Sequence, residues 1–318
     1  MSHWIWVLFF ILIGLFVALD LKGFQREKKT MSLSQALGLS LFWITLALLF
    51  NVAIYFIYEY ELLFDTLQIH PKSGHTAAIE FFTGYLLEKS LSLDNIFVIS
   101  LIFGIYKVPS HLQHRVLMWG ILTAAFLRGI LILLGVAIVE TFSWILYLFG
   151  ALIIFSGIKL LTDKGIEFSD HSRIKKIVQY FIPLAPAIQG ENFFIKHEGM
   201  WKMSPLFLAF LQIETADVVF ALDSIPAIFA ITLDPFIIYT SNIFAIFGLR
   251  ALYFALAPLI DRFRFIKSSL SLILIYIGIK MLSSKFYEIS NLTSLIIIIG
   301  LLVGGVVLSM LLKKETST

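Results

Sequence analysis

The 318-residue sequence contains no cysteine. Disulfide bonds, thiolate metal sites and catalytic cysteines are therefore excluded. Charged residues are also scarce, at 14% of the chain, whereas an ordinary soluble domain has about 25%. Hydrophobic residues make up 59% of the chain, and the mean hydropathy is +0.93. This composition excludes a soluble globular domain and a disordered chain, and it leaves a polytopic membrane protein.

Several functional motifs are missing as well. The sequence has no nucleophile elbow, P-loop or dinucleotide-binding fingerprint, so we do not expect an enzyme. A net charge of +3 is too small to indicate nucleic-acid binding. The N-terminus lacks the basic region and the small-residue cleavage site of a signal peptide. We therefore expect its apolar run to be retained as a first membrane span.

Apolar runs separated by polar segments predict an all-α membrane protein of about nine transmembrane helices, with residues 1–318 as one transmembrane domain. The predicted helices lie near residues 4–20, 33–58, 78–104, 115–139, 142–161, 204–231, 236–259, 267–285 and 291–312.

The distribution of basic residues predicts the orientation in the membrane. Of the 24 Lys and Arg residues, 17 fall in alternate connecting segments and in the C-terminal tail. The opposite connecting segments carry only Lys72 and Lys285. Because basic residues stay on the cytoplasmic side, we expect the N-terminus outside and the C-terminus in the cytoplasm of a bacterial inner membrane.

The longest connecting segment, residues 162–203, is predicted to be a cytoplasmic loop. Within it, apolar residues recur at helical spacing from Ile174 to Ile182, opposite basic residues, and Pro183 ends the pattern. This pattern is typical of a short amphipathic helix, either on the membrane surface or packed against the protein.

Two parts of the chain repeat each other. Glu88 and Asp94-Asn95 in the third span have the spacing of Asp217 and Asp223-Ser224 in the sixth. The matches continue with Arg128 and Arg250, then with Lys159 and Lys280, at separations of 129, 122 and 121 residues. The repeats cover residues 78–161 and 204–285. Each has three spans, an odd number, so the second is predicted to be inverted in the membrane, as in many transporters.

The charged residues inside the spans are the candidate functional residues, because a charge at mid-membrane is costly and marks a pathway or a site. The predicted metal ligands are Glu88, Asp94, Glu214, Asp217 and Asp223. The residues expected to support transport are Asn95, Ser224, Lys89, Arg128, Arg250, Lys159 and Lys280. We also expect Pro226 to break the sixth span beside Asp223.

The candidate ligands are Asp and Glu side chains, which bind metals through oxygen. No nitrogen ligand is expected to join them, because the histidines lie at helix ends or in loops. Oxygen ligands favour Mn²⁺, Mg²⁺ or Ca²⁺ over zinc or copper. Protons compete with a metal for carboxylates, which is the physical basis of proton antiport. The structural alternative is that the acids form buried salt bridges with the basic residues, and that Lys159 and Lys280 extend toward water at helix ends.

The segment from Ile213 to Thr232, IETADVVFALDSIPAIFAIT, closely resembles the signature of the TerC family of integral membrane proteins. The segment from Gly248 to Tyr253 and the motif from Glu88 to Asn95 resemble the same family. The similarity extends from about the second to the eighth span, and the layout is similar to that of the Alx-like branch.

The resemblance implies a divalent-cation exporter of the LysE-like transporter superfamily, with Mn²⁺ as the favoured ion and the five acids as its ligands. The lipid bilayer and the divalent cation are then the partners, and no permanently bound cofactor is expected. Two alternatives remain. One is a membrane partner protein that delivers metal to exported metalloenzymes or assists the secretion machinery, and the other is an exporter of small organic cations.

Overall fold

The structure is a computed structural model that describes residues 3–24, 32–60, 72–162, 183–185, 188, 190–197, 200–257, 265–287 and 289–311. Its elements are α1 (His3–Phe24), α2 (Leu33–Glu59), α3 (Gly74–Ile105), α4 (Ser110–Thr141), α5 (Ile145–Thr162), β1 (Phe194–His197), β2 (Met200–Met203), α7 (Pro205–Phe229), α8 (Pro235–Phe247), α9 (Leu249–Leu256), α10 (Ile266–Ser283) and α11 (Asn291–Leu311).

The structure is mostly helical and confirms a polytopic membrane protein. Among the described residues, seven segments are long and apolar enough to cross a membrane: α2, α4, α5, α7, α8 with α9, α10 and α11. Helices α1 and α3 are not among the seven. The apolar stretch of α1, Trp4–Phe16, is shorter, and the 32-residue α3 carries several charges. The number of nine spans and the outside position of the N-terminus stay predictions.

The seventh predicted span, residues 236–259, corresponds to one candidate membrane span, Pro235–Leu256, which divides at Gly248 into α8 and α9. The amine of Lys89 reaches this break and donates to the carbonyl of Ala245 at 3.3 Å. A Cβ on residue 248 would collide with that amine, so glycine leaves the space that Lys89 occupies. A cation at the end of α8 also satisfies a free carbonyl and the helix dipole.

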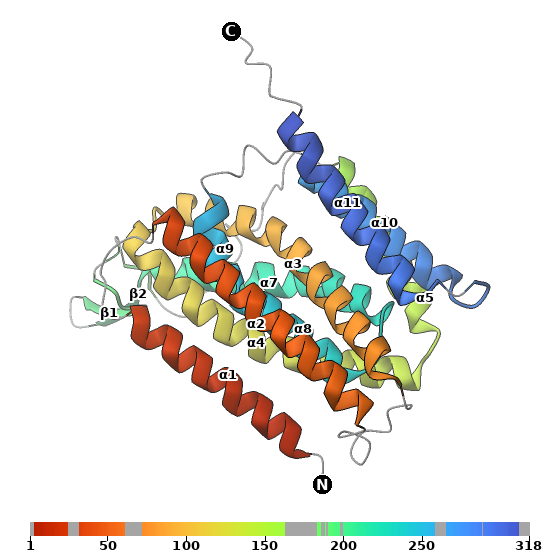
Figure 1. Cartoon of the computed structure of the whole chain (residues 1–318). Helices are drawn as coiled ribbons and strands as arrows, with labels where there is room; N and C mark the ends of the chain where they lie inside the picture. The colour runs from red at the N-terminus through yellow and green to blue at the C-terminus, as the bar shows by residue number, and fades with distance from the viewer. Residues whose placement is uncertain are drawn as a thin grey trace.

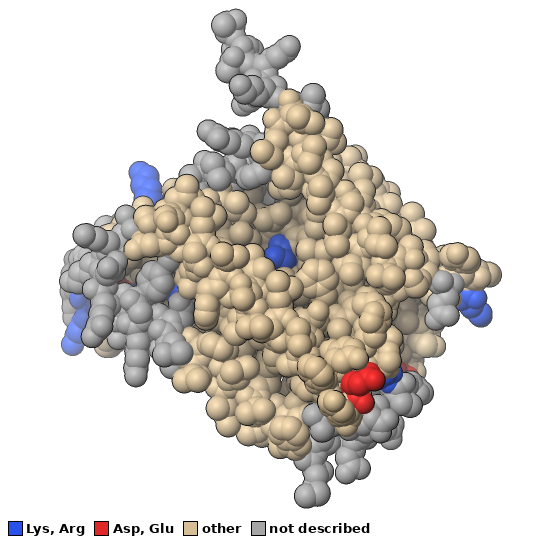
Figure 2. All heavy atoms as spheres, in the orientation of Figure 1, with Lys and Arg blue, Asp and Glu red and all other residues tan. Residues whose placement is uncertain are grey.

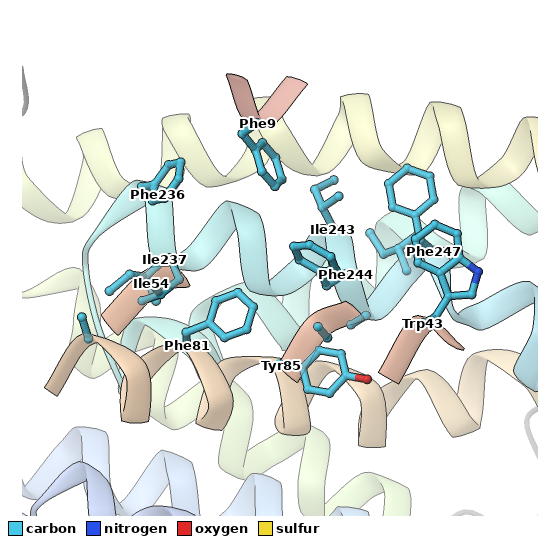
Figure 3. Packing of buried hydrophobic residues seen from close by; sticks show 14 of the residues in the cluster. Phe9, Trp43, Ile54, Phe81, Tyr85, Phe236, Ile237, Ile243, Phe244 and Phe247 are labelled. Carbon is cyan, nitrogen blue, oxygen red and sulfur yellow. The ribbon is translucent and has the colours of Figure 1, made fainter. Parts of the chain in front are cut away.

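Helix α8 lies at the centre of the bundle, between α1, α2, α3 and α4 (Figure 1). Figure 3 shows Phe81 of α3 and Phe244 of α8 packed together, with Trp43 of α2 against Phe247. The face of the bundle in Figure 2 is largely free of charge, with one basic side chain in its middle and the other charged side chains near its edges. This distribution is the one expected where lipid surrounds the middle of the bundle.

Helices α5 and α10 pack closely through glycine. A Cβ added to Gly157 would lie 3.1 Å from the backbone nitrogen of Ile275, and one added to Gly278 would lie 3.1 Å from the nitrogen of Ile154. These two contacts are reciprocal, because each residue of α10 follows its counterpart in α5 by 121 residues. Reciprocal contacts arise when two units meet across a two-fold relation. The inverted repeat stays a prediction, and this reciprocity favours it.

Two local expectations need correction. Pro226 does not break its helix, since α7 continues from Pro205 to Phe229. The proline lies in the last turn, where the buried residues of that turn hold the backbone in place. The predicted loop 162–203 also contains a β-hairpin, β1–β2, which an all-α prediction misses. The predicted amphipathic helix from Ile174 to Ile182 lies outside the described residues.

Candidate functional site

Arg128 of α4 is the centre of a buried polar group that we call the Arg128 cluster. Its guanidinium is 1% exposed and forms ion pairs with Glu88 of α3 and Asp217 of α7, the latter at 3.1 Å. It also donates to Asn242 of α8 at 2.9 Å and lies 3.5 Å from the hydroxyl of Ser224. One side chain therefore joins three other helices at the middle of the bundle.

The Arg128 cluster shows how Glu88 and Asp217 are paired in this conformation. Both acids are paired with a cation of the chain itself, as the structural alternative expects. Removing one partner from a buried pair is costly, because the other charge is left without compensation. One guanidinium nevertheless faces two carboxylates, so the pairing leaves the cluster with an excess of negative charge when both acids are ionised.

A pocket lies beside the Arg128 cluster, between α3, α4, α7 and the α8–α9 break. Glu214 and Asp217 of α7, Asn95 of α3 and Arg250 of α9 provide its polar lining. The remaining lining is apolar, with residues such as Ile99, Leu117 and Phe220.

Glu214 is the least satisfied of these side chains. It is 8% exposed, and within the described residues neither of its carboxylate oxygens meets the geometry of a hydrogen bond, although the Thr123 side chain is near enough to interact with it. The Oδ1 atom of Asn95 is also buried without a partner there, although its amide nitrogen lies 3.4 Å from Asp217. Buried oxygens without partners are costly and call for an explanation, such as a bound ion.

The structure separates Asp223 from the other acids. Its carboxylate accepts a hydrogen bond from Ser156 of α5 at 2.8 Å, so it faces α5 and not Arg128. Asp217 and Asp223 are six residues apart and point to different sides of α7, because no break realigns them. The side chain of Asp94 lies outside the described residues. Across the described residues, no group of three or more His, Asp or Glu side chains is arranged to hold a metal ion.

The basic residues predicted to support transport also lie apart. Lys89 contacts the α8–α9 break, and Arg250 lines the pocket with its Nη1 atom 3.4 Å from His114 Nδ1. Lys159, which the structural alternative expects to extend toward water, is exposed in the last turn of α5 and lies near enough to Asp223 to interact with its charge. Lys280 is 8% exposed and donates to Asn291, so for this residue that expectation is wrong.

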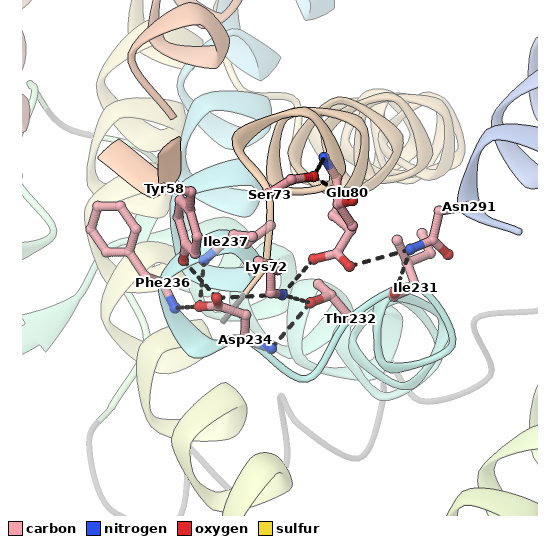
Figure 4. Close-up of polar contacts among 11 residues, drawn as sticks. Tyr58, Lys72, Ser73, Glu80, Ile231, Thr232, Asp234, Phe236, Ile237 and Asn291 are labelled. Atoms are coloured by element: carbon pink, nitrogen blue, oxygen red, sulfur yellow. Dashed lines mark hydrogen bonds and ion pairs between the residues drawn. The ribbon is translucent and has the colours of Figure 1, made fainter. Parts of the chain in front are cut away.

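The sequence reasoning missed a second polar group, which we call the Lys72 cluster (Figure 4). The amine of Lys72 lies 2.7 Å from Glu80 of α3 and 3.5 Å from Asp234, the N-cap residue of α8. The other members of the cluster are Tyr58, Thr232, Lys280 and Asn291. Glu80 lies near the start of the predicted span 78–104, and no spacing motif links it to Asp234. Only the packing of α3 against α8 brings the two acids together.

The chain belongs to the integral membrane protein TerC family, whose model matches residues 73–317. An uncharacterized membrane protein of Myxococcus xanthus is 39% identical over 318 residues, which cover 100% of this chain and 95% of that protein. The Alx protein of Escherichia coli (strain K12) is 41% identical over 307 residues, which cover 94% and 92%, respectively.

The name of the Escherichia coli protein proposes a membrane-bound redox modulator. An Alx protein of Shigella flexneri bears the same name and is also 41% identical. The family and the Alx-like branch inferred from the sequence are therefore confirmed, and the protein is an integral, multi-pass membrane protein with bacterial relatives. No solved structure gives a significant match.

Proposed function

We propose that this protein is a membrane transporter that exports a divalent metal cation, most simply Mn²⁺, through the pocket between α3, α4, α7 and α9. The observation that supports it is the pair of partnerless carboxylate oxygens of Glu214, buried beside Asp217 and the free Oδ1 atom of Asn95. Carboxylate and amide oxygens that converge in a small buried pocket are ligands that a hard divalent cation prefers.

The Arg128 guanidinium supplies positive charge beside the acids, as a bound metal ion would. In the structure it pairs with both Glu88 and Asp217, while Glu214 forms no ion pair among the described residues. A divalent ion that enters beside Glu214 would compete with Arg128 for Asp217. Arg128 would then balance the charge of the site whenever the ion is absent.

Protons would compete with the ion for the same carboxylates, so exchange of metal for protons is the coupling that we propose. The membrane is proposed to be the bacterial inner membrane, with the N-terminus outside. We further propose that α3–α5 and α7–α10 form two inverted units of the LysE-like kind, which the reciprocal contacts of Gly157 and Gly278 support.

Mn²⁺ flux into proteoliposomes across an imposed pH gradient tests the proposal. Glu214→Gln keeps the shape of the side chain and removes its charge, so we expect the initial rate to fall at least about tenfold, the equivalent of about 1.4 kcal/mol. Glu140→Gln is the matched control, because Glu140 is exposed at the end of α4. Asp223→Asn separates the two candidate sites, and the pocket predicts a smaller loss for it.

A wild-type rate in Glu214→Gln would show that the pocket is not the binding site. Absence of flux for Mn²⁺, Ca²⁺ and Mg²⁺ in well-folded protein would instead favour the membrane partner protein. A flux assay with labelled lysine tests the exporter of small organic cations. The redox role in the name of the Alx relatives cannot use a thiol couple of this chain, which has no cysteine.

A further inference from the structure

The Lys72 cluster closes one end of the bundle. The amine of Lys72 links the beginning of α3 to the beginning of α8 through Glu80 and the N-cap residue Asp234. Asp234 also accepts a hydrogen bond from Tyr58 of α2 at 2.6 Å. Figure 4 shows these side chains converging from separate elements onto Lys72. The polar contacts thus fasten α2, α3 and α8 to one another at this end.

The same cluster also reaches the helices on the other side of α3. Asn291, the first residue of α11, donates to Glu80 at 3.3 Å and to the carbonyl of Ile231 at 3.2 Å. Its Oδ1 atom accepts from Lys280 of α10 at 3.0 Å. Glu80 is therefore shared between Lys72 and the α10–α11 pair, and it cannot move away without breaking both contacts.

The Lys72 and Arg128 clusters lie in register along two helices. Glu80 and Glu88 are eight residues apart on α3, and Asp234 and Asn242 are eight residues apart on α8. Eight residues of an α-helix span about 12 Å. Because α3 and α8 both begin at the Lys72 end, each cluster occupies one level between the same two helices.

The packing between these two levels is tight. Thr83, one turn inside Glu80, is completely buried, and a Cβ added to Gly84 would lie 3.0 Å from the hydroxyl oxygen of Ser241. The pocket of Glu214 lies beyond the Arg128 cluster, on the side away from Lys72, since Asn95 follows Glu88 along α3. The Lys72 end is thus closed, and the space beside the site lies toward the other end.

We infer that the Lys72 cluster is a gate, closed in this conformation, at the end of the bundle where α3 and α8 begin. Opening separates Lys72 from Glu80 and Asp234 and lets α3 part from α8 and α11. The gate regulates access to the pocket of Glu214, so its role in transport rests on the proposed function.

The energetics of the two clusters fit this assignment. A gate must break and reform during each cycle, which demands contacts of modest strength. The side chain of Lys72 is 17% exposed, whereas that of Arg128 is 1% exposed. Water can reach Lys72 and replace its partners, whereas the buried Arg128 pair has no such substitute.

Single-cysteine labelling tests the gate directly, because the chain has no cysteine of its own. Thr83→Cys places a thiol just inside the closed end, and its reaction with a membrane-impermeant maleimide is measured in right-side-out and inside-out vesicles. Phe286→Cys, exposed at 88% in the turn before α11, supplies the rate of an open thiol and identifies the side. In the wild-type background we expect Thr83→Cys to react at least about tenfold more slowly than Phe286→Cys, equivalent to about 1.4 kcal/mol.

Lys72→Met removes the charge and nearly keeps the length of the side chain. In this background we expect Thr83→Cys to be labelled about tenfold faster, a change in rate equivalent to about 1.4 kcal/mol. Lys72→Arg should keep the thiol protected. Lys285→Met is the matched control, because Lys285 is exposed in the α10–α11 turn and has no polar contact within the described residues.

Equal labelling in the Lys72→Met and wild-type backgrounds would overturn the gate, as would fast labelling of Thr83→Cys without any second change. Size-exclusion profiles exclude variants that have not folded. Labelling requires no transported ion, so the gate and the transport of Mn²⁺ can fail separately. A variant that opens the gate while no cation is transported would overturn the proposed function alone.

Discussion

The Arg128 and Lys72 clusters both connect α3 to α8, yet their charges differ. In the Lys72 cluster two acids, Glu80 and Asp234, face two cations, Lys72 and Lys280. In the Arg128 cluster and its adjoining pocket, three acids, Glu88, Asp217 and Glu214, lie beside two cations, Arg128 and Arg250.

The difference indicates which cluster needs something from outside the chain. Balanced charges satisfy each other and hold helices together, so the Lys72 cluster is complete without a ligand. Unbalanced buried acids are costly unless a cation or a proton joins them. The excess of acidic over basic side chains is therefore the reason for proposing the pocket of Glu214 as the binding site.

The largest expected effect is the loss of stability on removing Arg128. Arg128→Met leaves Glu88 and Asp217 buried without a cation, and we expect the free energy of unfolding to fall by about 3–5 kcal/mol. Unfolding of the purified protein in detergent with denaturant measures it. Arg128→Lys, which keeps the charge, should lose less. A loss below about 1 kcal/mol in Arg128→Met would mean that the cluster is not a strong structural pair.

Removing Lys72 should have a smaller effect on stability. The Lys72 side chain is 17% exposed, whereas its partners Glu80 and Asp234 are buried, so we expect Lys72→Met to lower the free energy of unfolding by about 1–3 kcal/mol. Salt screens exposed charges, so the difference from wild type should shrink at high ionic strength, while that of Arg128→Met should not. Equal salt dependence in the two variants would contradict the contrast between the clusters.

The smallest effect is expected from Gly120 of α4. A Cβ at this position would lie 3.1 Å from Oε1 of Glu214, so Gly120→Ala should displace the carboxylate slightly and weaken Mn²⁺ binding about threefold, or about 0.65 kcal/mol. Stability should be unchanged or higher, because alanine favours the helix. Measurement of free Mn²⁺ by electron paramagnetic resonance checks the affinity.

Gly104→Ala is the control for this substitution, since nothing lies within 4 Å of its added Cβ. Unchanged Mn²⁺ binding in both glycine variants would show that the position of Glu214 does not matter for the ion.

Much of the fold was predictable because lipid imposes strong rules on sequence. Helices lie close to the predicted ranges since each membrane span must be a long apolar run. The break at Gly248 was not predictable, because the run of apolar residues continues across it. It depends on Lys89, which is 159 residues away and becomes a neighbour only in the folded chain.

The candidate site was predictable in its residues and not in its geometry. Charged residues in apolar runs pointed to Glu88, Glu214, Asp217 and Arg128, which the structure brings around one region. The same reasoning placed Asp223 with them, whereas the unbroken α7 turns it toward Ser156. Local patterns cannot decide which side of a helix faces which neighbour.

The sequence by itself determined that the chain is an integral membrane protein of the TerC family, because composition and motifs do not depend on packing. It also identified the acids of the Arg128 cluster and its pocket, Glu88, Asp217 and Glu214. The tertiary structure alone decided which acids are paired, which is left without a partner, and that Lys72 joins Glu80 to Asp234. These properties depend on distances between helices far apart in the chain, and only the packed bundle sets those distances.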